Sequence, residues 1–155
     1  MNSIFIVDDQ DYYIYKVFSS KQGVLKDCFS NGWLIKDRSS RASLIYNGEI
    51  FESEDAMEND NDPYLWIEEI NIKPREGIEI DIVFILLTEN NRREKEYIFF
   101  STKEVEDFCK EFNYTVEWKD IDNASNKKYH GEIFYKDKEG NKHFMYEVTG
   151  IKMDE

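Results

Sequence analysis

Hydrophobic and polar residues alternate in many short segments of this chain, the pattern of half-buried β-strands. The longest apolar run, at positions 82–87, reads Ile-Val-Phe-Ile-Leu-Leu and has the length of a buried strand. The remaining segments are bounded by turn-forming residues. The pattern predicts strands over residues 3–7, 12–18, 33–35, 43–46, 49–51, 64–72, 78–87, 94–100, 114–118, 132–136 and 142–148.

Two segments have helical spacing instead. The first, residues 21–29, follows the candidate N-cap Ser20 and ends before Asn31-Gly32. The second begins with the capping box Ser101-Thr102-Lys103-Glu104. Each has one apolar stripe, Val24, Leu25, Cys28 and Phe29 in the first helix, and Val105, Phe108, Cys109 and Phe112 in the second.

Turn signals set the expected order of strand pairing. Asn47-Gly48 predicts a type I′ hairpin, because both residues accept a positive φ at low cost. Residues 74–77 and 138–141 predict turns that pair the strands on either side of them. We expect no internal repeat, and no Pro/Gly-rich linker divides the chain. We therefore expect one domain, residues 1–155, with an α+β fold in which a curved, mostly antiparallel sheet packs against two short helices.

Charge changes this picture, because the excess is concentrated in one region. The formal net charge is −13. Residues 1–51 carry six acids and six bases, whereas residues 52–81 carry eleven acids and two bases. The sequence has no basic surface for DNA or RNA, and anionic membranes would repel it. We expect a basic protein partner, without direct contact with nucleic acid or a membrane.

The expected contact surface combines carboxylates with aromatic side chains. Six of the eleven residues from Glu52 to Asp62, a predicted loop, are acids. If the turn at 74–77 pairs the flanking strands, further acids join these on one outer face beside two aromatic anchors. An acidic loop can also serve only solubility. The predicted partner-binding residues are Glu52, Glu54, Asp55, Glu58, Asp60, Asp62, Tyr64, Trp66, Glu68, Glu69, Glu79 and Asp81.

Catalytic, metal and cofactor sites are not expected. Glu58, Asp60, Asp62 and Glu69 match an EF-hand spacing, but Pro63 replaces the glycine that the loop requires. His130 and His143 have no clustered ligand neighbours, and His143 is expected to face solvent. Cys28 and Cys109 lie in apolar helix stripes and are expected in the core. No phosphate-binding or nucleophile motif occurs, so we predict a protein that is not an enzyme and binds no metal or cofactor.

The expected compartment is the cytoplasm. The chain has two cysteines far apart in sequence, as is usual for free thiols in a reducing environment. The first residues lack the basic and apolar segments of a signal peptide, and no run approaches the ~20 apolar residues of a membrane span.

In its small size, acidity and lack of catalytic motifs, the chain resembles the immunity proteins that bacteria make against their own toxins. The resemblance implies stoichiometric binding to a toxin domain, commonly a basic nuclease, whose active site or substrate groove is covered. Carboxylates would then occupy the place of phosphates on a surface built for a polyanion.

Two other functions stay open from the sequence. A nucleic-acid mimic of phage or plasmid origin would inhibit a DNA-binding enzyme, and would need carboxylates spaced along an extended surface. A small-ligand carrier or enzyme built in a curved sheet would use some of the 24 Phe, Trp and Tyr residues to line a pocket.

Overall fold

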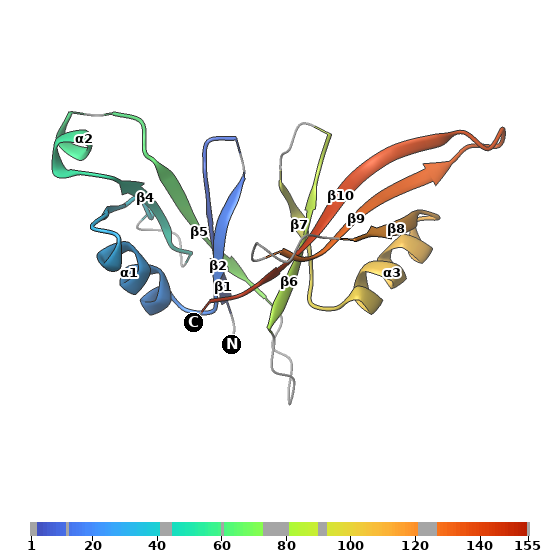
Figure 1. Ribbon diagram of the computed structural model, residues 1–155, viewed down its shortest axis with the longest axis horizontal. Coiled ribbons are helices and arrows are strands. Elements are labelled where there is room, and N and C mark those ends of the chain that lie inside the picture. The colour runs from blue at the N-terminus through green and yellow to red at the C-terminus, as the bar shows by residue number, and fades with distance from the viewer. Residues whose placement is uncertain are drawn as a thin grey trace. The chain divides into compact units, whose positions relative to one another are not determined.

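The computed structural model describes residues 3–11, 13–40, 45–59, 61–72, 81–89, 93–120 and 127–154 (Figure 1). The chain divides into two compact units. Unit 1 is Met1–Ile78 together with Met153–Glu155, and unit 2 is Glu79–Lys152. Each unit contains its own antiparallel sheet and its own core, so the two are described separately. The prediction of a single domain stays a prediction, which calorimetry can test.

Unit 1 is a five-stranded sheet in the order β2-β1-β5-β4-β3, with every neighbouring pair antiparallel. Helix α1 begins after its N-cap Ser20 and buries Val24 and Cys28 in the core of the unit. The elements are β1 (Ser3–Asp8), β2 (Ile14–Phe18), α1 (Lys21–Ser30), β3 (Leu34–Asp37), β4 (Asn47–Phe51), α2 (Glu54–Glu58) and β5 (Leu65–Asn71).

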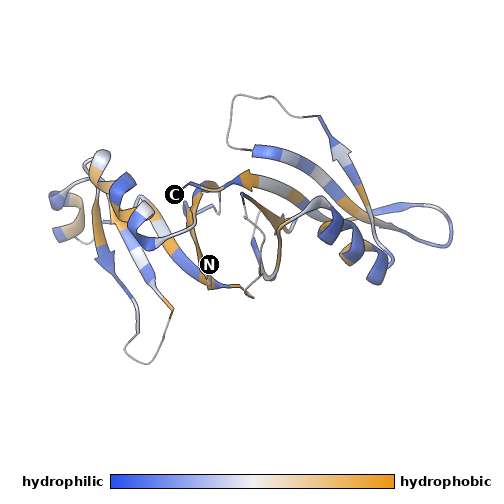
Figure 2. Ribbon diagram, turned by 90° about the horizontal axis from the view of Figure 1, so that it is seen from below, coloured by the Kyte–Doolittle hydropathy of each residue, from blue (hydrophilic) through white to orange (hydrophobic). Residues whose placement is uncertain are grey.

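Unit 2 is also a five-stranded antiparallel sheet, in the order β7-β6-β10-β9-β8. Helix α3 begins after Ser101 and buries Val105, Phe108 and Cys109. Hydrophobic and hydrophilic residues are interleaved along the strands of both sheets (Figure 2). The elements are β6 (Ile82–Leu87), β7 (Arg93–Phe99), α3 (Thr102–Glu111), β8 (Thr115–Lys119), β9 (Lys127–Lys136) and β10 (Lys142–Lys152).

The predicted α+β fold with mostly antiparallel strands is confirmed. The details differ, because the described strands form two sheets rather than one and the described helices number three rather than two.

The two units have the same topology, which contradicts the expectation that the chain lacks a repeat. Both follow the order strand, strand, helix, strand, strand, strand, and α2 is an addition to unit 1. The spatial order of the strands is also the same, with β1 to β5 taking the places of β6 to β10. One ββαβββ module is therefore present twice.

Strand register is shared as well as strand order. The tetrapeptide Gly-Glu-Ile-Phe occurs at residues 48–51 and again at 131–134, in β4 and β9. Four ladders contain corresponding pairs: Phe5↔Phe18 and Phe84↔Phe99, Ile35↔Ile50 and Val116↔Ile133, Gly48↔Ile67 and Gly131↔Val148, and Val7↔Ile67 and Leu86↔Val148.

Helices α1 and α3 correspond at their caps and at their buried positions. Both have ten residues, and in both a serine N-cap accepts a hydrogen bond of 3.1 Å from the backbone N–H three positions later. Both are followed by a residue with positive φ, which favours Gly or Asn at this place: Gly32 at 71° and Asn113 at 59°. The corresponding residues are Ser20 and Ser101, Val24 and Val105, Cys28 and Cys109, and Trp33 and Tyr114.

The predicted Asn-Gly hairpin is wrong. Asn47 and Gly48 lie inside β4, where Gly48 pairs with Asp37 on one side and Ile67 on the other. A glycine fits this strand position because a Cβ atom would lie 2.9 Å from the Tyr46 hydroxyl and 3.3 Å from Ile67 Cδ1. Residues 43 and 44 of the predicted hairpin lie outside the described part of the chain.

The strands on either side of residues 74–77 do not pair with each other. β5 is hydrogen-bonded to β1 and β4, and β6 is hydrogen-bonded to β7 and β10, so neither has an edge available for the other. The single outer face expected to combine Glu68 with Asp81 therefore does not form. β5 pairs with β1 and β6 pairs with β10, and these partners are distant in sequence, so turn signals alone do not reveal them.

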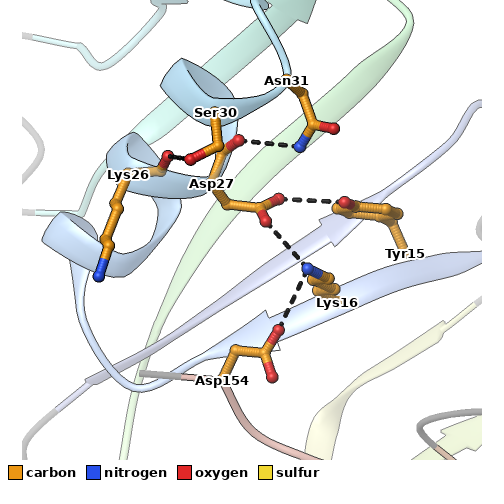
Figure 3. A network of polar contacts seen from close by, with 7 residues as sticks. All are labelled: Tyr15, Lys16, Lys26, Asp27, Ser30, Asn31 and Asp154. Carbon is orange, nitrogen blue, oxygen red and sulfur yellow. Dashed lines mark hydrogen bonds and ion pairs between the residues drawn. The ribbon is translucent and has the colours of Figure 1, made fainter.

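The last residues of the chain belong to unit 1. The backbone N–H of Asp154 donates to the Val17 carbonyl at 2.8 Å, and the Ser19 N–H donates to the Asp154 carbonyl at 2.9 Å. Figure 3 shows Lys16 of β2 reaching both Asp27 of α1, at 2.9 Å, and Asp154, at 3.3 Å. Burial alone would lower the pKa of Lys16, but these carboxylates, Asp27 first, outweigh it and raise the pKa.

Deleting residues 153–155 should lower the free energy of unfolding by about 2 kcal/mol. The deletion removes two backbone hydrogen bonds and the buried side chain of Met153, which is 8% exposed. Chemical denaturation measures the change. The control Asp154→Asn retains the backbone bonds and weakens only the ion pair, so we expect a loss below about 1 kcal/mol. Equal losses in both variants would contradict the assignment to backbone pairing and Met153.

Candidate functional site

Helix α2 forms within the acidic stretch that was predicted to be a loop. Ser53 caps it by accepting a hydrogen bond from the Ala56 N–H at 3.1 Å. Glu54 and Asp55 lie in its first turn, where carboxylates stabilise the positive end of the helix dipole. The serine cap and these two acids favour a helical turn, which the sequence analysis did not predict.

The acidic side chains of this insert point to solvent. Glu52, Glu54, Asp55, Glu58 and Asp62 are all exposed. Within the residues that the structure describes, none of these five carboxylates forms an ion pair. No ion pair with a described base therefore offsets their mutual repulsion, and a cationic group from outside would relieve it.

A cleft of about 420 Å³ lies beside α2. Its walls come from three segments of unit 1: the turn between β1 and β2, the end of β4 with α2, and the residues that lead into β5. Phe51 is buried, whereas Tyr64 is 47% exposed. The lining residues are Asp9, Gln10, Asp11, Phe51, Glu52, Ala56, Asn61, Asp62, Pro63 and Tyr64.

The backbone around the cleft is held by local hydrogen bonds. One carboxylate oxygen of Asp9 accepts from the N–H groups of Asp11, at 2.9 Å, and Tyr13, at 3.0 Å, which closes the turn. The Tyr64 N–H donates to the Ile50 carbonyl at 2.8 Å. The Tyr64 ring meets Trp33 edge to face, with centroids 5.4 Å apart. An aromatic side chain is thus fixed next to four acids, Asp9, Asp11, Glu52 and Asp62.

The structure brings only part of the predicted site together. Glu52, Asp62 and Tyr64 line the cleft, and Glu54, Asp55 and Glu58 lie on or at the ends of α2. The sequence analysis missed the contribution of Asp9, Gln10 and Asp11. The acidic turn 8–11 was the available signal, but nothing in the sequence showed that it lies near residues 52–64.

The other predicted residues have different positions. Glu69 accepts a hydrogen bond of 2.8 Å from the Tyr46 N–H and so supports the fold of unit 1. Trp66 and Glu68 are half-buried in β5, opposite Asp8 and Ile6 of β1. Asp81 is exposed just before β6, in unit 2. Asp60 and Glu79 lie outside the described residues.

Metal ligation has no support in the described ranges, where no group of three or more His, Cys, Asp and Glu side chains could hold an ion. Of the EF-hand spacing, Glu58 ends α2, Asp62 lines the cleft and Glu69 bonds to the backbone, so these three do not converge. His143 is exposed as predicted. Its Nε2 lies 2.9 Å from the Asp137 carboxylate, and its ring stacks on Tyr135.

Both cysteines are buried free thiols, as predicted. Burial, with a smaller effect of Asp27, raises the pKa of Cys28 to about 11. Burial, with a smaller effect of Glu106, raises the pKa of Cys109 to about 11. Because the thiolate is the nucleophilic form, both are unreactive at neutral pH.

Comparison with protein-family models, curated protein sequences and solved structures finds no match to this chain. In the described part of the chain, no helix has the length and apolar character required to cross a membrane.

Proposed function

We propose that this protein is a non-catalytic binding protein that neutralises a basic protein partner, in the manner of an immunity protein against a nuclease-type toxin. The observation that carries the proposal is the acidic cleft of unit 1, with five exposed carboxylates on and around α2 that have no ion pair among the described residues.

The internal repeat strengthens this assignment. In unit 2 the corresponding connection, between β9 and β10, is the short turn 137–141, so α2 and its acids are not needed to build the module. A fold requirement cannot explain the insert. The insert places carboxylates beside an exposed aromatic ring, which suits a partner surface that carries Lys or Arg.

The contact would rest on complementary charge. A Lys or Arg side chain of the partner enters the cleft between Asp11, Glu52 and Asp62, and Tyr64 packs against its aliphatic part. If the partner is a nuclease, the same carboxylates occupy the position of the nucleic-acid phosphates. Such a complex prevents substrate from binding without any chemistry in the inhibitor.

The experiment is an affinity capture at ~0.15 M salt, where the Debye length is about 8 Å. The immobilised protein is exposed to a nuclease-treated lysate of its source cells, and a basic protein retained at unit stoichiometry is purified. Affinity is then measured by calorimetry for a five-site variant that neutralises Glu52, Glu54, Asp55, Glu58 and Asp62 as Gln or Asn. We expect affinity to fall on the order of a hundredfold.

A matched variant controls for net charge. It neutralises five exposed acids of unit 2, namely Glu89, Asp107, Glu111, Asp120 and Glu139. The expected loss is only a few-fold, since none of these acids lines the cleft and exposed charges are screened by salt. Equal losses in the two variants would reduce the acidic insert to a contribution to net charge, and no retained partner would overturn the proposal.

A further inference from the structure

The outer face of α1 carries large apolar side chains that are exposed to water. Phe29 is 87% exposed and Leu25 is 43% exposed. The two residues are four positions apart and therefore adjacent on the helix surface. Single exposed apolar residues are common, whereas adjacent ones form an apolar patch that is available for contact.

The second module provides an internal comparison. Counted from the serine N-caps, the outward positions of α1 are Gln22, Leu25, Lys26 and Phe29, and those of α3 are Lys103, Glu106, Asp107 and Lys110. All eight side chains are exposed. The same helix in the same topology thus has a fully charged outer face in unit 2, so the apolar pair in unit 1 is not required by the fold.

The charge next to the pair is basic, because Lys26 is exposed beside Phe29. Lys21, one turn before Leu25, turns to the Tyr46 ring, with its Nζ 4.1 Å from the ring centre, and interacts electrostatically with the exposed Asp37. The one acid of this helix, Asp27, is engaged by Lys16 at 2.9 Å and by the Tyr15 hydroxyl at 3.1 Å. This surface therefore presents an aromatic ring with a positive edge, on a chain whose net charge is −13.

We infer that the outer face of α1, formed by Leu25, Lys26 and Phe29, docks a second protein whose surface has an apolar pocket edged by Asp or Glu. Phe29 fills the pocket and Lys26 meets the carboxylates. A buried Phe contributes about 150–250 Å², enough for the central anchor of an interface of about 800 Å² per partner. The inference does not depend on the basic partner proposed for the cleft.

Charge argues against a second copy of the chain. A symmetric α1–α1 contact would bring Lys26 toward the same lysine of the other copy, with Asp27 already engaged. An unsymmetric contact would build a ring or an open chain of molecules rather than a closed dimer. An anionic membrane would attract two lysines but repel the molecule as a whole.

Photo-crosslinking tests the inference in the cells that make the protein. A benzophenone analogue of phenylalanine replaces Phe29 in one full-length variant, and Lys110, the equivalent residue of α3, in a matched one. We expect position 29 to crosslink to one other protein, at a peptide that combines apolar residues with Asp or Glu. Position 110 should give no such product. Lys26→Glu should lower the yield from position 29 at least fivefold.

The crosslinked protein is then purified for binding measurements. Phe29→Glu should weaken its affinity about thirtyfold, the effect of losing an aromatic anchor, whereas Lys110→Glu should leave it unchanged. Both variants should have the same melting temperature as the wild-type protein, because both positions are exposed. The five-site α2 variant should retain the crosslink at position 29. Crosslinks to the chain itself, to lipid alone, to a basic peptide, or equally from positions 29 and 110 would overturn the inference.

Discussion

Replacing Ile50 or Ile133 by alanine should lower the free energy of unfolding by about 2–5 kcal/mol in each case. The two residues are the third members of the repeated Gly-Glu-Ile-Phe segments, in β4 and β9. Ile50 is 1% exposed in the core of unit 1, and Ile133 is 0% exposed in the core of unit 2. Each substitution leaves a cavity among side chains that belong to regular elements and cannot fully close it.

Differential scanning calorimetry and urea unfolding measure these losses. The controls Gln22→Ala and Lys103→Ala occupy equivalent exposed positions on α1 and α3, and should change stability by less than about 0.5 kcal/mol. A loss at one isoleucine but not at the other would contradict the equivalence of the two modules. The scan also tests the single-domain prediction, which requires both variants to shift one shared transition rather than two separate ones.

Gly150→Val should be comparably damaging, with an expected loss of about 3 kcal/mol. A Cβ atom at Gly150 would lie 2.8 Å from Phe84 Cε1 and 3.0 Å from Tyr129 Cβ. The Phe84 ring is 2% exposed and packs against Trp118 and Tyr129, so it has no room to move. Equilibrium unfolding of the variant provides the measurement.

A double substitution identifies the cause. Phe84→Ala alone should cost about 3–5 kcal/mol, but together with Gly150→Val it should cost less than the two single losses added, because the new side chain occupies the vacated space. Gly140→Ala is the control: its surroundings are open, but φ is +84°, so its loss of about 1 kcal/mol comes from backbone strain. If the losses in unfolding free energy of Gly150→Val and Phe84→Ala were strictly additive, steric contact with the Phe84 ring would not be the cause of the Gly150→Val loss.

Position 150 also shows how two copies of one module diverge. Glu69 occupies the corresponding place in unit 1, opposite Phe5 as Gly150 lies opposite Phe84. The Glu69 carboxylate turns to the Tyr46 N–H, at 2.8 Å, so unit 1 has room for a side chain here. The cross-strand pair Arg38–Glu49 recurs in unit 2 as Lys119–Glu132, which retains the sign of both charges.

The repeat was missed because the two modules share few residues and the spacing between corresponding residues changes along the chain. Phe5 and Phe84 are 79 positions apart, Ser20 and Ser101 are 81 apart, and Gly48 and Gly131 are 83 apart. No constant offset aligns the modules. The shared residues are mainly the cap, the buried positions and one strand segment, since only these are constrained by the fold.

The sequence by itself determined the local properties: the two capped helices, the strand character of most segments, the burial of both cysteines and the acidity of residues 52–62. These depend on contacts between near neighbours and on the period of the apolar positions. The tertiary structure alone decided the division into two sheets, the placement of Asn47-Gly48 within a strand and the meeting of the β1–β2 turn with the α2 insert. Each of these is a pairing of segments distant in the chain, which depends on the simultaneous packing of a whole sheet.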